Sequence, residues 1–341
     1  MRSVLLIVVL ALSAAANIYV TEGSLYAFQT YGPEKTTEGV LLFTICVHVE
    51  PFGATPSRGA GYHDLRLFKM HSRDLMTLAR IVEGHGGRLV VQAQTPFTKV
   101  AVDEGDTILA DLEAHGHEIG LHFHEYVHLG RNPESLPVTS WTRSMTNEII
   151  FLKKAGVDAI RCWSGGNRYK KILEAASNVG LEVMTDYKDP RSQETSPLVM
   201  DVNPWRPSGG PDGGDLTLFS QNDPGGRIVY LPDGAYDPEM LAAKREIILE
   251  NSVEVYLQFL EDSLKHSLEA AQPEKLNVFH ITVHLGEFRG NPSKPYSIID
   301  DFLTVNVDPL VSAGKIRWAT FSQMADAYSQ WERDHTTCPA R

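Results

Sequence analysis

The chain alternates short, nearly continuous apolar runs with longer segments whose apolar residues recur every three or four positions. The first run, residues 40–49, is rich in β-branched side chains and has no extended polar face, which is typical of a strand buried on both sides of a parallel sheet. Glycine or a polar residue marks several of the expected helix ends. The pattern predicts strands at 40–49, 88–92, 119–124, 158–162, 181–185, 276–285 and 315–319, and helices at 72–83, 103–114, 139–155, 167–179, 237–267, 297–313 and 321–333.

Strands that alternate with helices in this way form a parallel α/β sheet covered by helices, either a closed barrel or an open doubly wound sheet. No glycine-rich phosphate loop follows the first strand, which disfavours the nucleotide-binding open sheet. The 341 residues suit a single α/β barrel with insertions. We therefore predict one catalytic domain at residues 39–335, with a Pro- and Gly-rich loop at about 189–237 lying over the mouth of the barrel.

The first residues have one positive charge, an apolar run and then small side chains, which is the layout of a secretory signal peptide. We expect residues 1–16 to be removed, residues 17–38 to form an N-terminal extension, and the protein to be secreted or periplasmic with no remaining transmembrane span. The net charge of -12 disfavours a nucleic-acid partner. Three cysteines are too few for a disulfide scaffold, so Cys46 and Cys162 are expected to be buried free thiols, with a disulfide between them as the alternative.

Histidines cluster in one short stretch, because five of the thirteen lie between His115 and His128. If the strand there continues to residue 124, His122 and His124 share one face, since side chains alternate along a strand. Two imidazoles side by side at a strand end form half of a metal site. Glu50, at the end of the first strand, is the expected third ligand, and this set favours a divalent metal, with zinc before iron or another transition metal.

Other ionisable side chains are also expected where apolar strands end, namely His48, Arg161, Asp186 and His284. Each costs desolvation unless it is paired, and in a barrel the chemistry gathers at the carboxyl ends of the strands. We expect His48 to accept a proton from a water that the metal activates, and His284 to donate one to the leaving group. Arg161 would hold Asp186 or Glu50 in place, or neutralise charge that develops on the substrate.

Several of these residues lie in motifs that resemble a known family. The stretch Gly116–His122 is similar to the second motif of polysaccharide deacetylases (carbohydrate esterase family 4), commonly GHEIGNH. Val47–Glu50 is similar to the first motif, in which a general base and a metal ligand, both acidic, end the first strand. Arg161–Gly165 resembles the third, arginine-led motif, and Val283–Leu285 resembles the last, which supplies the catalytic histidine.

The resemblance covers roughly residues 40–320. It implies a distorted (β/α) barrel of about seven parallel strands that removes acetyl groups from N- or O-acetylated sugars, with a metal held by one acid and two histidines. Two positions depart from the family. His48 replaces the usual aspartate base, and Tyr126 stands where the second metal histidine usually lies, four residues after the first. The second histidine ligand is therefore His124 or, by a looped path, His128.

On this basis we expect a metal-dependent hydrolase that deacetylates a saccharide, with His48 or Glu125 as the base and His284 as the proton donor to the leaving amine or alkoxide. Two alternatives stay open. The departure at position 48 fits a carbohydrate-binding barrel without turnover, and another metal-dependent amide or glycosidic hydrolase on a related barrel would have the same sequence pattern. The sequence does not indicate the sugar or the oligomeric state.

Overall fold

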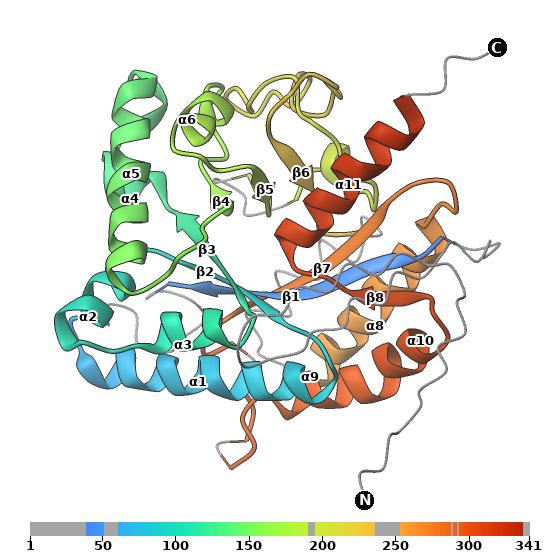
Figure 1. Ribbon diagram of the computed structural model, residues 1–341. Helices are drawn as coiled ribbons and strands as arrows, with labels where there is room; N and C mark the ends of the chain where they lie inside the picture. The colour runs from blue at the N-terminus through green and yellow to red at the C-terminus, as the bar shows by residue number, and fades with distance from the viewer. Residues whose placement is uncertain are drawn as a thin grey trace, which may run out of the picture. The chain divides into compact units, whose positions relative to one another are not determined.

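The computed structural model describes residues 39–50, 61–189, 195–235, 253–287, 289–291 and 293–336 (Figure 1). The expected signal peptide at 1–16, the extension at 17–38 and the expected helix start at residue 237 lie outside these residues. Within the described part of the chain, no helix is long and apolar enough to cross a membrane.

The strands form one sheet in which every strand pair is parallel. Along the sheet the order is β6-β5-β4-β3-β2-β1-β7, and β8 also pairs with β1. Residues 41–48 of β1 pair with β7, whereas its other edge pairs with β8 at residues 41–43 and with β2 at residues 45–49. The predicted distorted (β/α) barrel is therefore confirmed. The strands are β1 (Leu41–Val49), β2 (Leu89–Ala93), β3 (Glu118–Phe123), β4 (Cys162–Gly165), β5 (Val183–Thr185), β6 (Val229–Leu231), β7 (Asn277–His284) and β8 (Ile316–Trp318).

The loop predicted at 189–237 contains β6, a strand that the sequence analysis did not identify. The described part of this segment closes the wall of the barrel between β6 and β7. Trp205 pairs antiparallel with Tyr230, and the backbone N–H of Val278 donates to the carbonyl of Val202 at 2.7 Å. Residues 202 and 205 of this segment therefore lie in the wall of the barrel, between two strands, rather than over its mouth.

Helices α1 and α9 lie on the outer side of β1, whereas α11 lies on the inner side of the sheet, against β5 and β6 (Figure 1). The helix predicted at 103–114 is two helices, because Gly105 adopts a left-handed conformation with φ of 65° and ends the first. The helices are α1 (Leu65–Gly84), α2 (Phe97–Glu104), α3 (Ile108–Ala114), α4 (Glu125–Leu129), α5 (Val138–Lys154), α6 (Ile172–Asn178), α8 (Val253–Ala270), α9 (Ser297–Phe302), α10 (Asp308–Ser312) and α11 (Phe321–Thr336), with 3-10 turns at Pro133–Ser135 and Pro197–Val199 and a π-helical turn at Leu303–Val307.

The inner face of the barrel changes from apolar to polar along the strands. At the amino end, Phe321 and Met324 of α11 belong to a buried cluster with Leu42 of β1. Because side chains alternate along a strand, Leu42, Cys46 and His48 share one face of β1. The apolar interior therefore gives way to ionisable groups toward the carboxyl end, where the predicted chemistry lies.

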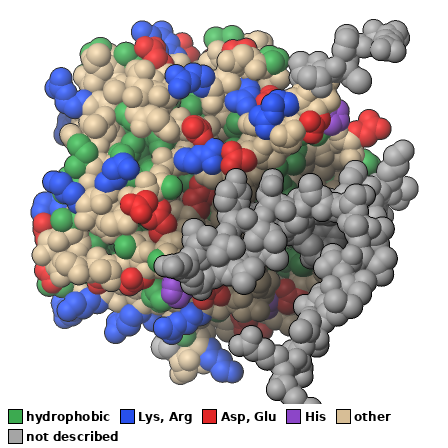
Figure 2. Space-filling model, in the orientation of Figure 1, with side chains coloured by type: hydrophobic (Ala, Val, Ile, Leu, Met, Phe, Trp, Pro, Cys, Tyr) green, Lys and Arg blue, Asp and Glu red, His purple; other side chains and the backbone are tan. Residues whose placement is uncertain are grey.

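His85, which follows α1, links that helix to α9 and α10. Its Nδ1 lies 2.8 Å from Asp308 Oδ2 and its Nε2 lies 2.9 Å from Asp300 Oδ1. Burial alone would lower the pKa of His85, but hydrogen bonds to the two aspartates outweigh it and raise the pKa. On the face drawn in Figure 2, basic and acidic side chains are intermixed rather than gathered by sign.

Candidate metal centre and active site

Glu50, His122 and His124 converge at the carboxyl ends of β1 and β3. Their ligand atoms all lie within 4.8 Å of one another. His122 Nε2 is 3.5 Å from Glu50 Oε2 and 3.0 Å from His124 Nε2, and His124 Nε2 contacts the same glutamate oxygen. The structure thus brings together the three residues that the sequence analysis grouped as metal ligands.

This donor set fits a divalent metal. Two ligand atoms bound to a tetrahedral zinc at about 2.0–2.1 Å lie about 3.3 Å apart, which is close to the separations of His122 Nε2 from its two neighbours. His122 Nδ1 lies 2.7 Å from Ser164 Oγ, so an N–H at Nδ1 can donate to the hydroxyl and leave the lone pair of Nε2 for a metal. The strand register makes His122 and Ser164 direct neighbours on β3 and β4.

The electrostatics of Glu50 and His122 favour the charge states that a metal ligand needs, whereas the hydrogen bond to Glu50 raises the pKa of His124 despite burial. Burial, followed by neighbouring histidines, lowers the pKa of His122 well below its ordinary value and keeps the ring neutral. Burial opposes ionisation of Glu50, but hydrogen bonds from His122 and His124 outweigh it and hold the pKa of the carboxyl well below its usual range. A neutral imidazole and an ionised carboxylate are the forms that coordinate metals.

His128 lies beside the metal group but is not directed at Glu50. Its Nε2 is 3.0 Å from Gln94 Oε1, and its Nδ1 is 3.4 Å from Glu148 Oε1. The same Gln94 oxygen accepts the backbone N–H of His124 at 3.1 Å. The histidine that the structure places beside Glu50 is therefore His124, whereas His128 helps to fix Gln94 and through it the backbone of His124.

His284 approaches the same group from the end of β7. Its Nε2 lies 3.3 Å from Glu50 Oε1, and its Nδ1 lies 3.0 Å from Glu287 Oε2. Burial alone would lower the pKa of His284, but the charge and hydrogen bond of Glu287, together with Glu50, outweigh it and raise the pKa. A protonated imidazole held between two carboxylates is placed to donate a proton.

His48 and Asp186 lie just below this group, toward the inside of the barrel. His48 Nε2 is 3.3 Å from Ser164 Oγ and 3.4 Å from Asp186 Oδ2, and its ring stacks on His122 at 4.1 Å between centroids. Both contacts use the same ring nitrogen, so these residues do not form a serine–histidine–aspartate triad, which needs both nitrogens. Burial lowers the pKa of His48, although Asp186 opposes the shift.

Arg161 is not brought to the site, and its predicted roles toward Asp186 and Glu50 were wrong. The sequence analysis ended a strand at this position, but β4 begins one residue later, at Cys162. Arg161 therefore lies at the amino end of the sheet, where its guanidinium binds Glu182 and Asp326 at 2.7 Å each. The polar residue that β4 carries to the site is Ser164.

The sequence analysis also missed residues that support the site from inside the barrel. Thr282 Oγ1 donates to Asp186 Oδ1 at 2.5 Å, and His280 Nε2 lies 3.5 Å from the same oxygen. Positions 280, 282 and 284 alternate on β7, so the period-two pattern could have identified His280 and Thr282 as neighbours of His284 on the inner face. No comparable sequence pattern could have identified Ser164 as a site residue.

Comparisons with known proteins identify the fold. No protein-family model and no curated protein matches this sequence. Among solved structures, the chain is similar to the Puue allantoinase (TM-score 0.58, 13% identity, 95% of this chain and 100% of that one) and to the "probable polysaccharide deacetylase" from Pseudomonas aeruginosa PAO1 (TM-score 0.58, 14% identity, 88% of this chain and 93% of that one). It is also similar to 40% of the longer 4-alpha-glucanotransferase of Thermococcus litoralis, over 84% of this chain (TM-score 0.50, 17% identity). At these identities the likeness establishes the fold, so the resemblance predicted from the motifs is confirmed as a barrel fold shared with polysaccharide deacetylases.

Proposed function

We propose that this protein is a metal-dependent hydrolase that removes acetyl groups from N- or O-acetylated saccharides. The observation that carries the proposal is the convergence of Glu50, His122 and His124 beside His284 at the carboxyl ends of three strands. A fold shared with a polysaccharide deacetylase supports the choice of substrate. Zinc is the proposed metal, because the ligands are two imidazoles and one carboxylate.

Each residue has a distinct task in this proposal. Glu50, His122 and His124 hold the metal, which when bound polarises the acetyl carbonyl and lowers the pKa of a coordinated water. His284 donates a proton to the leaving amine or alkoxide from Nε2, the nitrogen that faces Glu50. Glu287 accepts the hydrogen bond of Nδ1 and stabilises the protonated ring.

Two residues are candidates for accepting the proton of the attacking water. His48 is held by Asp186 and lies against His122. Glu125 follows His124 directly and accepts the backbone N–H of Gly166 at 3.2 Å. Burial raises the pKa of Glu125, which makes its carboxylate a stronger base than an exposed glutamate.

Metal analysis together with acetate release tests the proposal. Purified protein should contain a metal at the Glu50 site and should release acetate from acetylated oligosaccharides, and His122→Ala should lose both. His115→Ala is the matched control, because His115 lies on the same segment, is 60% exposed and contacts Glu83 instead of the site. A wild type that turns over fully after its metal has been stripped would sink the proposal.

The departure at position 48 favours a second candidate, a carbohydrate-binding barrel without turnover. His48 is buried and engaged with Asp186 and Ser164, so it need not serve as a base. This candidate expects saccharide binding that is unchanged in His284→Ala, with no acetate released by the wild type. Measuring hydrolysis of a panel of acetylated sugars, amides and glycosides separates both candidates from a hydrolase of another specificity.

We also propose that the protein is exported, and detection of the mature protein outside the cytoplasm tests this.

A further inference from the structure

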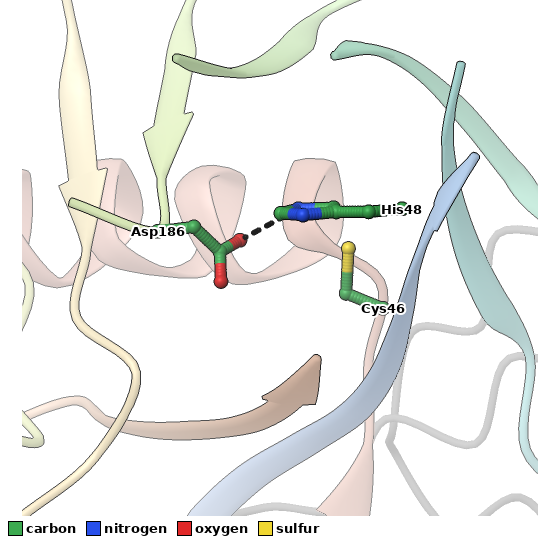
Figure 3. A group of neighbouring side chains, drawn as sticks. All are labelled: Cys46, His48 and Asp186. Atoms are coloured by element: carbon green, nitrogen blue, oxygen red, sulfur yellow. Dashed lines mark ion pairs between the residues drawn. The ribbon is translucent and has the colours of Figure 1, made fainter. Parts of the chain in front are cut away.

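A second group of metal-binding side chains lies deeper in the barrel than the Glu50 site. Cys46 Sγ, a ring nitrogen of His48 and a carboxylate oxygen of Asp186 lie within 4.8 Å of one another. Each of the three residues is at most 3% exposed. Cys46 and His48 project from one face of β1, and Asp186, which follows β5, directs its carboxylate toward His48 (Figure 3).

Hydrogen bonding leaves this group incompletely satisfied. The separation of His48 Nε2 from Asp186 Oδ2 is 3.4 Å, whereas charged N–H···O hydrogen bonds are about 2.7–2.9 Å long. No described residue donates a hydrogen bond to Asp186 Oδ2, although the oxygen is buried. Cys46 is a free thiol. Two ligands of a tetrahedral zinc at about 2.0–2.2 Å lie about 3.4 Å apart, and a sulfur at about 2.3 Å lies about 3.6 Å from a nitrogen ligand.

The surroundings of Asp186 fix the oxygen that faces Cys46 and His48. Its other oxygen accepts the hydroxyl of Thr282 at 2.5 Å and lies 3.5 Å from His280 Nε2, as outer partners do when they orient a metal-binding carboxylate. Asp186 also adopts a left-handed backbone with φ of 54°, a conformation that costs about 1 kcal/mol and recurs at binding sites.

We propose that Cys46, His48 and Asp186 bind a second divalent metal ion, separate from the ion at Glu50. Zinc is the proposed metal, because the ligands are one sulfur, one nitrogen and one oxygen. On binding, the thiol of Cys46 releases its proton to solvent and the thiolate sulfur bonds to the metal. A thiolate and a carboxylate supply two negative charges, which balance a divalent cation inside the barrel. Ser164 Oγ lies between the two sites, 3.3 Å from His48 Nε2 and 2.7 Å from His122 Nδ1.

The site itself does not depend on deacetylation, but it bears on the proposed function at one point. If His48 Nε2 holds a metal, it has no lone pair left to accept a proton. Of the two candidate proton acceptors, only Glu125 then remains, and this statement alone rests on the proposed function. The departure at position 48 from the acidic residue of the polysaccharide deacetylases would thus mark a change from a base to a ligand.

Metal counting on the full-length protein tests the second site. The protein is stripped with a chelator, reloaded with zinc or cobalt and freed of excess metal. The wild type should hold two ions per chain, and Cys46→Ser and His122→Ala one each. Cys162→Ser is the matched control and should hold two, because Cys162 is also a buried free cysteine of the same interior cluster but is absent from the proposed ligand set.

The cobalt spectrum distinguishes this site from the Glu50 site, which has no sulfur ligand. A thiolate-to-cobalt charge-transfer band should appear in the wild type, Cys162→Ser and His122→Ala, and vanish in Cys46→Ser. One ion per chain with the band would support the second site and contradict the first. A wild type without the band, or a band that persists in Cys46→Ser, would overturn the inference. If Cys46→Ser does not fold, the presence or absence of the charge-transfer band in the wild type still tests the second site.

Discussion

The hydroxyl of Ser164 offers a sharp test of how the Glu50 site is held. His122 Nδ1 and Ser164 Oγ are 2.7 Å apart, and both residues are buried. In Ser164→Ala this ring nitrogen loses its acceptor, and the proton can move to Nε2, where it blocks the lone pair that the metal needs. Loss of such an outer partner weakens metal binding by about 10–100-fold, so we expect the zinc Kd of the Glu50 site to rise by that factor, or by about 1.4–2.7 kcal/mol.

Chelator competition at fixed pH and ionic strength measures this change. Ser263→Ala is the matched control, because Ser263 is equally buried and its hydroxyl donates to the backbone carbonyl of Phe259 at 2.6 Å within α8. Both variants lose one buried hydroxyl, but only Ser164→Ala should change the zinc Kd. If folded Ser164→Ala binds zinc within twofold of the wild type, the proposed orientation of His122 is refuted.

Three further predictions concern the residues around the site and the fold. Arg161→Ala should keep its metal and its turnover and lose about 1 kcal/mol or less of stability, because its ion pairs lie at the exposed amino end; a tenfold loss of activity would contradict this placement. His284→Ala should lower kcat by about 10²–10⁴-fold at unchanged metal content, and a matching loss of metal would make it a ligand instead. Because hydrogen bonds to two aspartates raise the pKa of His85 above 6.5 despite burial, its contribution to stability is present below that value and is lost as the pH rises through the raised pKa. Urea denaturation of the wild type and His85→Asn should therefore converge as the pH rises, and a difference that grows would contradict the assignment.

Most of the fold could be predicted because the strands are either long and apolar or bounded by clear turn residues. The run at 40–49 became β1 almost residue for residue. Among the strands, the failures are short ones. Val229–Leu231 has three residues inside a Pro- and Gly-rich segment, and three residues cannot display a period of two. Its backbone is held by pairing with β5 and with residue 205, which local sequence does not encode.

The placement of the site residues depended on locating the carboxyl end of each strand. Glu50, His122 and His284 follow or end strands whose apolar pattern is long enough to fix that end. The prediction for Arg161 was wrong because the start of β4 is set by the pairing of residues 163–165 with β3 rather than by the apolar pattern before it. A shift of a few residues along a strand moves a side chain from one end of the barrel to the other, so this error changed a candidate catalytic residue into a surface ion pair.

β1 contributes residues to both proposed metal sites and to the apolar layer beneath them, so its pairing register determines whether those side chains face the interior. Leu42, Cys46 and His48 lie on one face of the strand, and Glu50 follows with the same period. A slip of one residue would turn every one of these side chains to the helix-covered face. The strand is held against such a slip by pairing with β7 along residues 41–48 and with β8 and β2 on its other edge. The strand with the most pairing partners is thus the one whose side chains must be placed most accurately, because both proposed metal ions take a ligand from it or from the residue that follows it.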